Sequence, residues 1–380
     1  MKITGFDIFT FSLPAALESN RQAGLPVVQP FSLKGNSLSK RDGFLIRLNS
    51  SDGAVGFGEI SPLPGFSQES LVEVKLQLKS LRLKIFNETI PQNCEKLEGV
   101  LGFWLSKYRL FPSVQFGFET AVLNLLADQK KVTLQRFLSP SKKINRKSIP
   151  LVGLLEGSLE NIAAEAKRMR KQGFRSFKLK VGAKNIAQDI EKVRRVQGVL
   201  KGQGTLRLDA NQFWEFLDAL CFAKAIEKDS IEYIEEPFKN ISTQLSRITE
   251  FFKASGIPVA LDESLAGMNP EDFKSYHGLR AVILKPTILG GIEKTFHWIQ
   301  KARAKGIDIV ISSTFESGMG LLTLARLAAA FACHPSGLDT YKWFSKDVLT
   351  AVLAMDQGNL ILPSMPLNEH QLNFSLLKKI

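Results

Sequence analysis

The chain has 380 residues, of which 44% are hydrophobic and 23% are charged, and its formal net charge is +13. This length exceeds one ordinary domain, and the composition is normal for a soluble globular protein with a large core. No apolar run is long enough to span a bilayer, and the start, MKITGFDIFTFSLP, lacks the apolar core and cleavage site of a signal peptide. Three widely separated cysteines favour reduced thiols over disulfides. We therefore expect a cytoplasmic protein without a membrane partner.

The positive charge has three interpretations: a nucleic-acid-binding surface, a lysine-rich solvated exterior, or a field that collects an anionic substrate. The basic residues are scattered, with no long basic tail and no interleaved aromatic residues. This pattern favours the solvated exterior over nucleic-acid binding. We expect a small anionic substrate and no nucleic-acid partner, and the oligomeric state stays open.

The first 112 residues predict a separate α+β domain, because strand-like segments precede a helix-like one. Two Gly/Pro-rich loops, Gly24–Gly35 and Pro62–Phe66, are placed to close over a site. Leu63 and Phe66 in the second loop are candidates for substrate contact, and the role of the loop at 20–35 stays open. The expected strands are 3–13, 43–50 and 54–60, and the expected helix is 67–86.

From about residue 148 the chain repeats a short β-branched strand followed by an amphipathic helix. Two of these helices close on Gly173 and Gly306, the usual helix terminator. Such alternation predicts βαβ units and a parallel sheet, with a barrel domain over 113–345 and a tail at 346–380 that returns to the first domain. The seven strands are expected at 148–155, 174–182, 205–211, 231–237, 258–264, 280–286 and 308–313.

Charged residues stand at the ends of five consecutive strands and are 23 to 29 residues apart: Lys180, Asp209, Glu235, Asp262 and Lys285. One strand, one helix and two loops of an eight-fold (β/α) barrel take roughly 30 residues, and the catalytic groups of such barrels come from these strand ends. An open doubly wound sheet remains an alternative. It would not bring five consecutive strand ends around one point.

Side-chain alternation along the strands predicts which acids point into the barrel. It selects Asp209, Glu235 rather than Glu236, and Asp262 rather than Glu263. Buried acids are costly unless they are paired or bound to a metal. Three hard oxygen ligands suit Mg²⁺, with Mn²⁺ as a possible substitute. The alternative is that these acids only form ion pairs with the nearby lysines.

Three lysines are expected at inward strand-end positions: Lys178 and Lys180 on the second strand and Lys285 on the sixth. The second and sixth strands lie on opposite sides of an eight-stranded barrel, so a substrate would lie between two ammonium-bearing walls. A metal beside a substrate carboxylate eases removal of the adjacent α-proton. Neighbouring cations would favour the neutral form of Lys180 that such a base requires. The arrangement predicts proton abstraction next to a carboxylate.

Five motifs, in this order and spacing, resemble the enolase superfamily and its muconate-lactonising subgroup: KLK (178–180), DAN (209–211), EEP (235–237), DES (262–264) and LKP (284–286). Four further segments, 40–48, 56–70, 112–126 and 312–320, are similar to the o-succinylbenzoate synthase family of that superfamily. The resemblance implies a TIM-like (β/α)7β barrel with an N-terminal α+β capping domain. It also implies a lysine-plus-Mg²⁺ site, a known design of the superfamily.

The resemblance further implies a lyase that dehydrates 2-succinyl-6-hydroxy-2,4-cyclohexadiene-1-carboxylate to o-succinylbenzoate in menaquinone or phylloquinone biosynthesis. Lys180 would remove the α-proton and help the hydroxyl to leave, Lys285 would stabilise the developing charge, and Lys178 would tune Lys180. Additional residues are expected to orient these groups or to contact the substrate: Arg207, Asn211, Ser312 and Ser313. Backbone N–H groups at a helix start near Gly318 would suit a substrate carboxylate.

Two alternatives remain open. An N-acylamino acid racemase or dipeptide epimerase of the same superfamily would use the same lysine pair, one base on each face of the α-carbon. A basic nucleic-acid-binding protein on an inactive barrel is the alternative from another class. It does not account for five motifs that keep costly inward charges.

Overall fold

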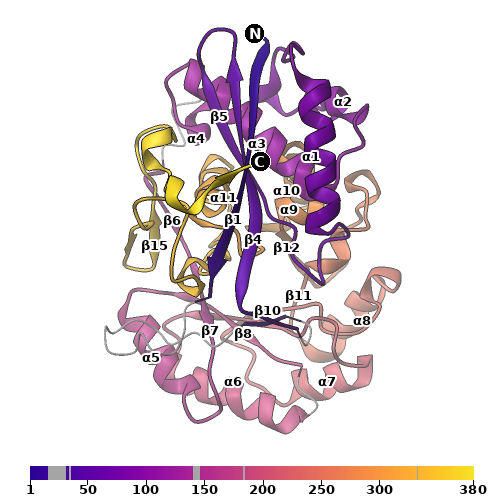
Figure 1. The fold of residues 1–380 in the computed structure, drawn as a ribbon. Helices are drawn as coiled ribbons and strands as arrows, with labels where there is room; N and C mark the ends of the chain where they lie inside the picture. Colours follow the sequence, from indigo (N-terminus) through magenta and orange to yellow (C-terminus); the bar gives the residue numbers. More distant parts are fainter. Residues whose placement is uncertain (16–30, 34–35, 140–145, 183–184, 332) are drawn as a thin grey trace.

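The computed structural model describes residues 1–15, 31–33, 36–139, 146–182, 185–331 and 333–380. An antiparallel sheet with helices forms the upper part of Figure 1, and a parallel barrel with its helices forms the lower part. Of the predicted loop Gly24–Gly35, only strand β2 (Phe31–Leu33) is described, and it pairs with β3 (Asn36–Leu38). The rest of that loop lies outside the described residues.

The antiparallel sheet has the order β16-β1-β4-β5. Strands β1 (Ile3–Pro14), β4 (Lys40–Ser50) and β5 (Val55–Ile60) come from the first domain, as the sequence predicts. Helix α1 (Leu71–Ile85) follows and begins with a capping box between Ser70 and Glu73. The first 139 residues also contain α2 (Val100–Ser106), α3 (Pro112–Gln129) and α4 (Leu134–Leu138).

Helix α3 packs against β4 and β5 and also contacts α9 (Pro286–Leu289) of the barrel. Glycines allow the close approach to the sheet. A methyl group at Gly58 would overlap the carbonyl oxygen of Gly117, and one at Gly56 would overlap that of Ala121. The GFGE segment therefore has a packing reason for both of its glycines.

Seven parallel strands form one sheet of order β13-β12-β11-β10-β9-β8-β7. Residues 336–337 fill the eighth position, because Ser336 pairs with Leu151 beside β7 and Gly337 pairs with Ser312 beside β13. The expected TIM-like (β/α)7β barrel is thus confirmed. Its strands are β7 (Val152–Leu155), β8 (Ser176–Lys180), β9 (Thr205–Asp209), β10 (Ile231–Glu235), β11 (Val259–Leu261), β12 (Leu279–Leu284) and β13 (Asp308–Ile311).

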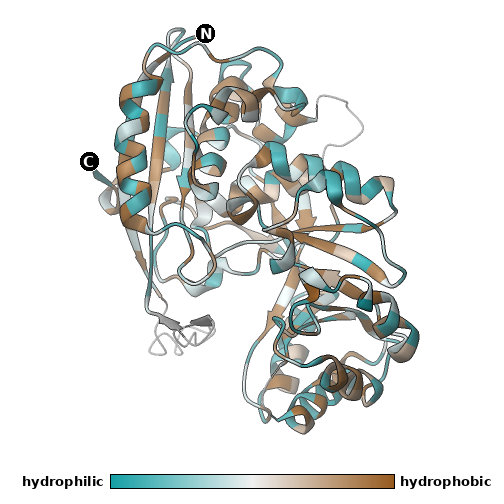
Figure 2. Cartoon of the chain, turned by 90° about the vertical axis from the view of Figure 1, so that its right-hand side faces the viewer, coloured by the Kyte–Doolittle hydropathy of each residue, from teal (hydrophilic) through white to brown (hydrophobic). Residues whose placement is uncertain are grey.

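The helices around the barrel separate two layers of core. The strands are mostly hydrophobic, whereas the surrounding helices carry mixed faces (Figure 2). Between β11 and β12 the chain forms only the short 3-10 helices Glu263–Leu265 and Pro270–Asp272, so one expected helix is missing there. The others are α5 (Ile162–Lys171), α6 (Ile186–Leu200), α7 (Phe216–Lys224), α8 (Arg247–Ser255), α9, α10 (Ile292–Ala304) and α11 (Gly318–Ala330).

The C-terminal segment contacts both parts of the molecule. Strand β15 (Asn359–Ile361) pairs with β6 (Ser148–Pro150), and β16 (Lys378–Lys379) pairs with β1, so that the C-terminus lies beside β1 in Figure 1. The expected single strand at 148–155 is therefore divided, because its first residues pair outside the barrel. The division of the chain at residues 112 and 345 stays a proposal.

No helix in the described ranges is long and apolar enough to cross a membrane. Cys94 and Cys333 are buried and Cys221 is exposed, and all three are free thiols.

Two buried carboxylates join the domains. Glu119 of α3 accepts hydrogen bonds from the backbone N–H groups of Ile292 (2.6 Å) and Glu293 (3.0 Å) at the start of α10. Glu293 in turn accepts from the N–H groups of Gly99 (2.8 Å) and Gly102 (2.6 Å) at the start of α2. Each carboxylate thus serves the positive end of a helix from the other part of the chain.

The close approach of α3 predicts opposite effects for two Gly→Ala changes in helices. A methyl group at Gly117 would meet the Ile60 side chain and the Glu59 carbonyl, whereas one at Gly198 of α6 would meet nothing within 4 Å. We expect Gly117→Ala to lower the free energy of unfolding by about 1–3 kcal/mol or more. The matched control Gly198→Ala should raise it by about 0.5–1 kcal/mol. Thermal melts of both variants check this, and equal melting temperatures would contradict the packing argument.

The buried Glu119 predicts a pH-dependent stability. Burial raises the pKa of Glu119 from 4.5 to about 7. The folded protein then holds a proton that the unfolded chain loses, so stability falls as pH rises from about 4.5 to about 7. Glu119→Gln removes this titration, so the melting temperature of the variant relative to wild type should rise across that window, by about 1–3 kcal/mol in stability. A difference that does not change with pH would refute the assignment.

Candidate active site

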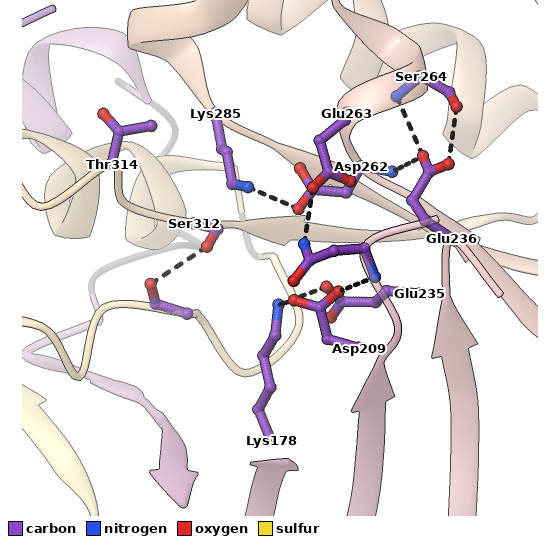
Figure 3. A network of polar contacts seen from close by, with 12 residues as sticks. Lys178, Asp209, Glu235, Glu236, Asp262, Glu263, Ser264, Lys285, Ser312 and Thr314 are labelled. Atoms are coloured by element: carbon purple, nitrogen blue, oxygen red, sulfur yellow. Dashed lines mark hydrogen bonds and ion pairs between the residues drawn. The ribbon is translucent and has the colours of Figure 1, made fainter. Parts of the chain in front are cut away.

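The carboxyl ends of the barrel strands bring acids and lysines together (Figure 3). Lys178 of β8 lies between the ends of the next two strands. Its Nζ is 2.8 Å from Oδ2 of Asp209 and also forms an ion pair with Oε2 of Glu235. The Asp209 and Glu235 side chains are almost completely buried. The lysine therefore compensates part of the charge that these carboxylates bring into the barrel.

A second lysine lies on the other side of the acids. Lys285 directly follows β12, and its Nζ is 2.6 Å from Oδ2 of Asp262, which directly follows β11. The neighbouring Glu263 accepts a hydrogen bond from Nδ2 of Asn211 at 2.7 Å. Asn211 also donates its backbone N–H to Oδ1 of Asp209 at 3.1 Å, so this asparagine connects the first and third acids.

The two acids of the EEP motif point in different directions, as alternation predicts. Glu235 turns toward Lys178. Glu236 instead accepts hydrogen bonds from the backbone N–H groups of Asp262 (2.7 Å) and Ser264 (3.0 Å) and from the Ser264 hydroxyl (2.7 Å). It thereby fixes the turn that carries Asp262.

Several residues just beyond the strand ends have left-handed backbone conformations. Asn211 has φ 44°, Gln212 has φ 58° and Glu236 has φ 44°. Such conformations cost free energy in non-glycine residues and concentrate at functional sites. Here they follow the strands that carry Asp209 and Glu235.

Burial and charge shift the pKa values of the site in a consistent way. Burial raises the pKa of Glu235 to about 7, and the negative charge of Asp209 adds to this effect while Lys178 opposes it. Burial disfavours the charge on Lys178, but its carboxylate neighbours outweigh burial and raise its pKa well above the ordinary value. For Lys285 burial acts in the same direction, and Asp262 outweighs it and raises the pKa. Lys178 and Lys285 are therefore cations at neutral pH.

These residues line a cavity of about 90 Å³ at the barrel mouth. Lys180 at the end of β8 and Lys285 beyond β12 both line it, and β8 and β12 are four positions apart in the eight-position barrel. Leu63 and Phe66 of the capping domain cover the same cavity. Its lining comprises Leu63, Phe66, Val152, Leu154, Lys178, Lys180, Asp209, Asn211, Lys285, Ser312, Ser313, Thr314, Phe315, Gly337, Asp339 and Thr340.

The structure thus brings nine of the twelve residues selected from the sequence into one lining. Glu235 lies beneath Lys178, and Asp262 lines an adjoining pocket with Phe66 and Lys285. Arg207 lies elsewhere. Its Nε and Nη2 bind Glu232, at 2.9 and 3.0 Å, and Nη1 donates to the carbonyl of Pro335 in the eighth strand position. Arg207 therefore lies inside the barrel, and it does not line either pocket.

The expected role of the helix start near Gly318 is wrong. Helix α11 does begin there, but its N–H groups already bind carboxylates of the protein. Glu59 accepts from Ser317 and Gly320, each at 2.9 Å, and Asp347 accepts from Gly318 at 2.9 Å. Ser312 and Ser313 do line the cavity, with the Ser313 hydroxyl 2.7 Å from that of Thr340.

Sequence analysis missed several lining residues. Asp339, buried and 2.7 Å from Lys342, follows the eighth strand position, which has no strand-like run of its own. Phe315 and Trp343 pack with Leu63 in a separate hydrophobic cluster over the cavity. Their sequence signal is weak, because they lie in loops. The GLDT segment directly after that strand position was the available clue.

The donor set fits a divalent cation. The carboxylates Asp209, Glu235, Asp262 and Glu263 gather four acidic groups in this region, and only Lys178 and Lys285 are paired with them. Carboxylate oxygens are the ligands that Mg²⁺ prefers. In the described ranges no three or more of these side chains are already arranged around a common metal position.

Comparison with known proteins places the chain in a family. Residues 161–366 match the family model "Enolase C-terminal domain-like", and residues 22–125 match "MenC, N-terminal domain". The o-succinylbenzoate synthase of Aliivibrio salmonicida is 32% identical, over 87% of this chain and 91% of that protein. The chloroplastic protein PHYLLO of Arabidopsis thaliana is also 32% identical, but the chain spans only 20% of its length.

A solved structure supports the fold. The N-succinyl Arg/Lys racemase of Bacillus cereus superposes with a TM-score of 0.81, at 21% identity, and the match covers 100% of both chains. The barrel, its capping domain and the acids at its strand ends are those of the enolase superfamily, whose enzymes generally use Mg²⁺. Within that superfamily, the chain belongs to the o-succinylbenzoate synthase family, and it is a lyase of that family.

Proposed function

We propose that the chain dehydrates 2-succinyl-6-hydroxy-2,4-cyclohexadiene-1-carboxylate to o-succinylbenzoate in menaquinone or phylloquinone synthesis, with Lys180 as the acid/base. The observation that carries this assignment is the position of two lysines, Lys180 and Lys285, on opposite strands of one cavity, with buried carboxylates between them. The substrate is a small dianion. A cavity with three lysines suits such a molecule.

The proposed reaction breaks one C–H and one C–O bond. Lys180, in its neutral form, takes the proton from C1, the carbon α to the ring carboxylate. Negative charge then develops toward that carboxylate, and Lys285, held as a cation by Asp262, stabilises it. The hydroxyl at C6 leaves with a proton from Lys180 as water, which restores the neutral lysine and completes the aromatic ring.

Lys178 has a different role in this proposal. Its ion pairs with Asp209 and Glu235 keep it protonated and fix its position one residue pair before Lys180 on the same face of β8. A fixed cation there disfavours the protonated form of Lys180. Lys178 thus tunes Lys180 rather than transferring the proton itself.

Asp209, Glu235 and Asp262 are the proposed ligands of a Mg²⁺ ion, which Mn²⁺ can replace. They end three successive strands and are buried. When bound, the ion supplies positive charge beside the substrate carboxylate. Asn211, hydrogen bonded to both Asp209 and Glu263, keeps these acids in place.

The metal assignment predicts loss of activity on removal of the ion. Chelator treatment should lower turnover by about 10²-fold or more, and added Mg²⁺ should restore it, because charge stabilisation of this kind is worth that much. Asp209→Asn should weaken Mg²⁺ binding in calorimetry. Asp229→Asn, a change at an acid outside both pockets, is the control. Full activity in a chelated sample would rule out the metal.

The lysine assignment predicts unequal effects of two Lys→Arg changes. Arg keeps the charge but is not a base. With a substrate analogue that cannot dehydrate, Lys180→Arg should abolish exchange of the α-proton in heavy water. Lys285→Arg should retain some turnover of the true substrate, because Lys285 needs only its charge. Circular dichroism of each variant controls for folding.

Equal and complete loss in both variants would contradict the one-base assignment. It would favour the N-acylamino acid racemase or dipeptide epimerase, in which each lysine must transfer a proton on its own face. The position of Lys180 and Lys285 on opposite barrel strands is the observation that keeps this second function open.

A further inference from the structure

Arg41 of β4 is a buried guanidinium that bridges two loops of the active-site roof. Its side chain belongs to the capping domain and is 1% exposed. Nη1 donates to the carbonyl of Pro62 at 2.6 Å, and Nη2 donates to that of Ser61. Nε donates to the carbonyl of Phe315 at 3.0 Å, across the domain boundary. One side chain therefore holds the capping loop and the loop after β13 at the same time.

Both loops reach the substrate cavity. The capping loop supplies Leu63 and Phe66, and the loop after β13 supplies Ser312–Phe315. Leu63 packs with Trp343, and the partly buried Phe66 and Phe315 join this cluster. The Phe66 ring also lies 5.8 Å from Nζ of Lys285. We call these four side chains, Leu63, Phe66, Phe315 and Trp343, the roof.

The loop after β13 is held in a conformation that it would not adopt on its own. Phe315 has φ 59°, in the left-handed region that bulky residues rarely adopt. Such a residue persists only where its surroundings determine it. The hydrogen bond from Arg41 to the Phe315 carbonyl is one such restraint, and it acts at the strained residue itself.

A second buried group joins the same two loops from below. Glu59 of β5 accepts from the Ser61 hydroxyl (2.5 Å) and, on the barrel side, from the N–H groups of Ser317 and Gly320. Arg41 and Glu59 thus grip adjacent residues of both loops. The difference is that Glu59 holds the helix start, whereas Arg41 holds the residues next to the roof side chains.

We propose that Arg41 is a positioning residue for substrate binding: it sets the height and orientation of the roof over the cavity and so determines affinity for the part of the substrate remote from the ring carboxylate. This inference rests on the proposed function. Arg41 contacts carbonyl groups of the loops and none of the reacting groups, so its loss should loosen the roof and leave the lysines and acids in place.

The test compares three variants with wild type. Arg41→Gln removes the bridge, Arg41→Lys keeps the charge but serves fewer carbonyls, and Arg47→Gln is the matched control. Arg47 lies on the same strand and binds Asp7 and Glu369 at the surface, far from the cavity lining. The measurements are KM, kcat, the affinity for the product o-succinylbenzoate, and amide hydrogen exchange in the two loops.

Arg41→Gln should raise KM and the product dissociation constant roughly tenfold or more while kcat changes less than about threefold, the pattern of lost binding that is equal in ground and transition states. Amide protection at 61–67 and 314–317 should fall in the same variant. Arg41→Lys should be intermediate, and Arg47→Gln should match wild type. If Arg41→Gln does not fold, Arg41→Lys decides by the same measures.

Unchanged KM, product affinity and loop protection in a folded Arg41 variant would overturn the inference, and so would a loss confined to kcat. A wild-type protein that does not turn over the cyclohexadiene substrate would overturn the proposed function instead. In that case the hydrogen-exchange comparison still decides whether Arg41 holds the two loops.

Discussion

Burial of several carboxylates at adjacent strand ends is the constraint on which the rest of the site depends. Asp209, Glu235 and Asp262 are each at most 4% exposed, and isolated buried charges of one sign are strongly unfavourable. The barrel meets this cost with Lys178 and Lys285, which are themselves buried and are held as cations by the acids. Neither set is tolerable without the other, so the charges that perform the chemistry also keep one another in place.

The joint between the domains uses a related device three times. Glu59 binds the start of α11, Glu119 binds the start of α10, and Glu293 binds the start of α2. In each case a buried carboxylate accepts N–H groups that a helix cannot satisfy internally, and it meets the positive end of the helix dipole. Because donor and acceptor lie far apart in the sequence, every such contact fixes one segment against another. The cap is therefore anchored by polar contacts as well as by packing.

The sequence was sufficient where a local period determines the outcome. Strand alternation and the 23 to 29 residue spacing predicted the barrel, the inward positions of Lys178, Asp209 and Glu235, and the outward turn of Glu236. It was insufficient where a long-range partner decides. The start of α11 looks free in the sequence, and only the fold shows that Glu59, 258 residues away, occupies it. Arg207 points inward as alternation requires, but period alone does not give depth along the strand.

The arrangement also separates the part of the site that performs the reaction from the part that selects the substrate. Lysines and acids lie on barrel strands, whose positions are fixed by hydrogen bonds on both sides. The roof comes from loops, where residues such as Leu63 and Phe315 can change without disturbing that frame. A barrel shared with an enzyme named as a racemase therefore does not by itself choose a reaction. The choice depends on which substrate the roof presents to Lys180 and Lys285, and Arg41 connects that roof to the frame.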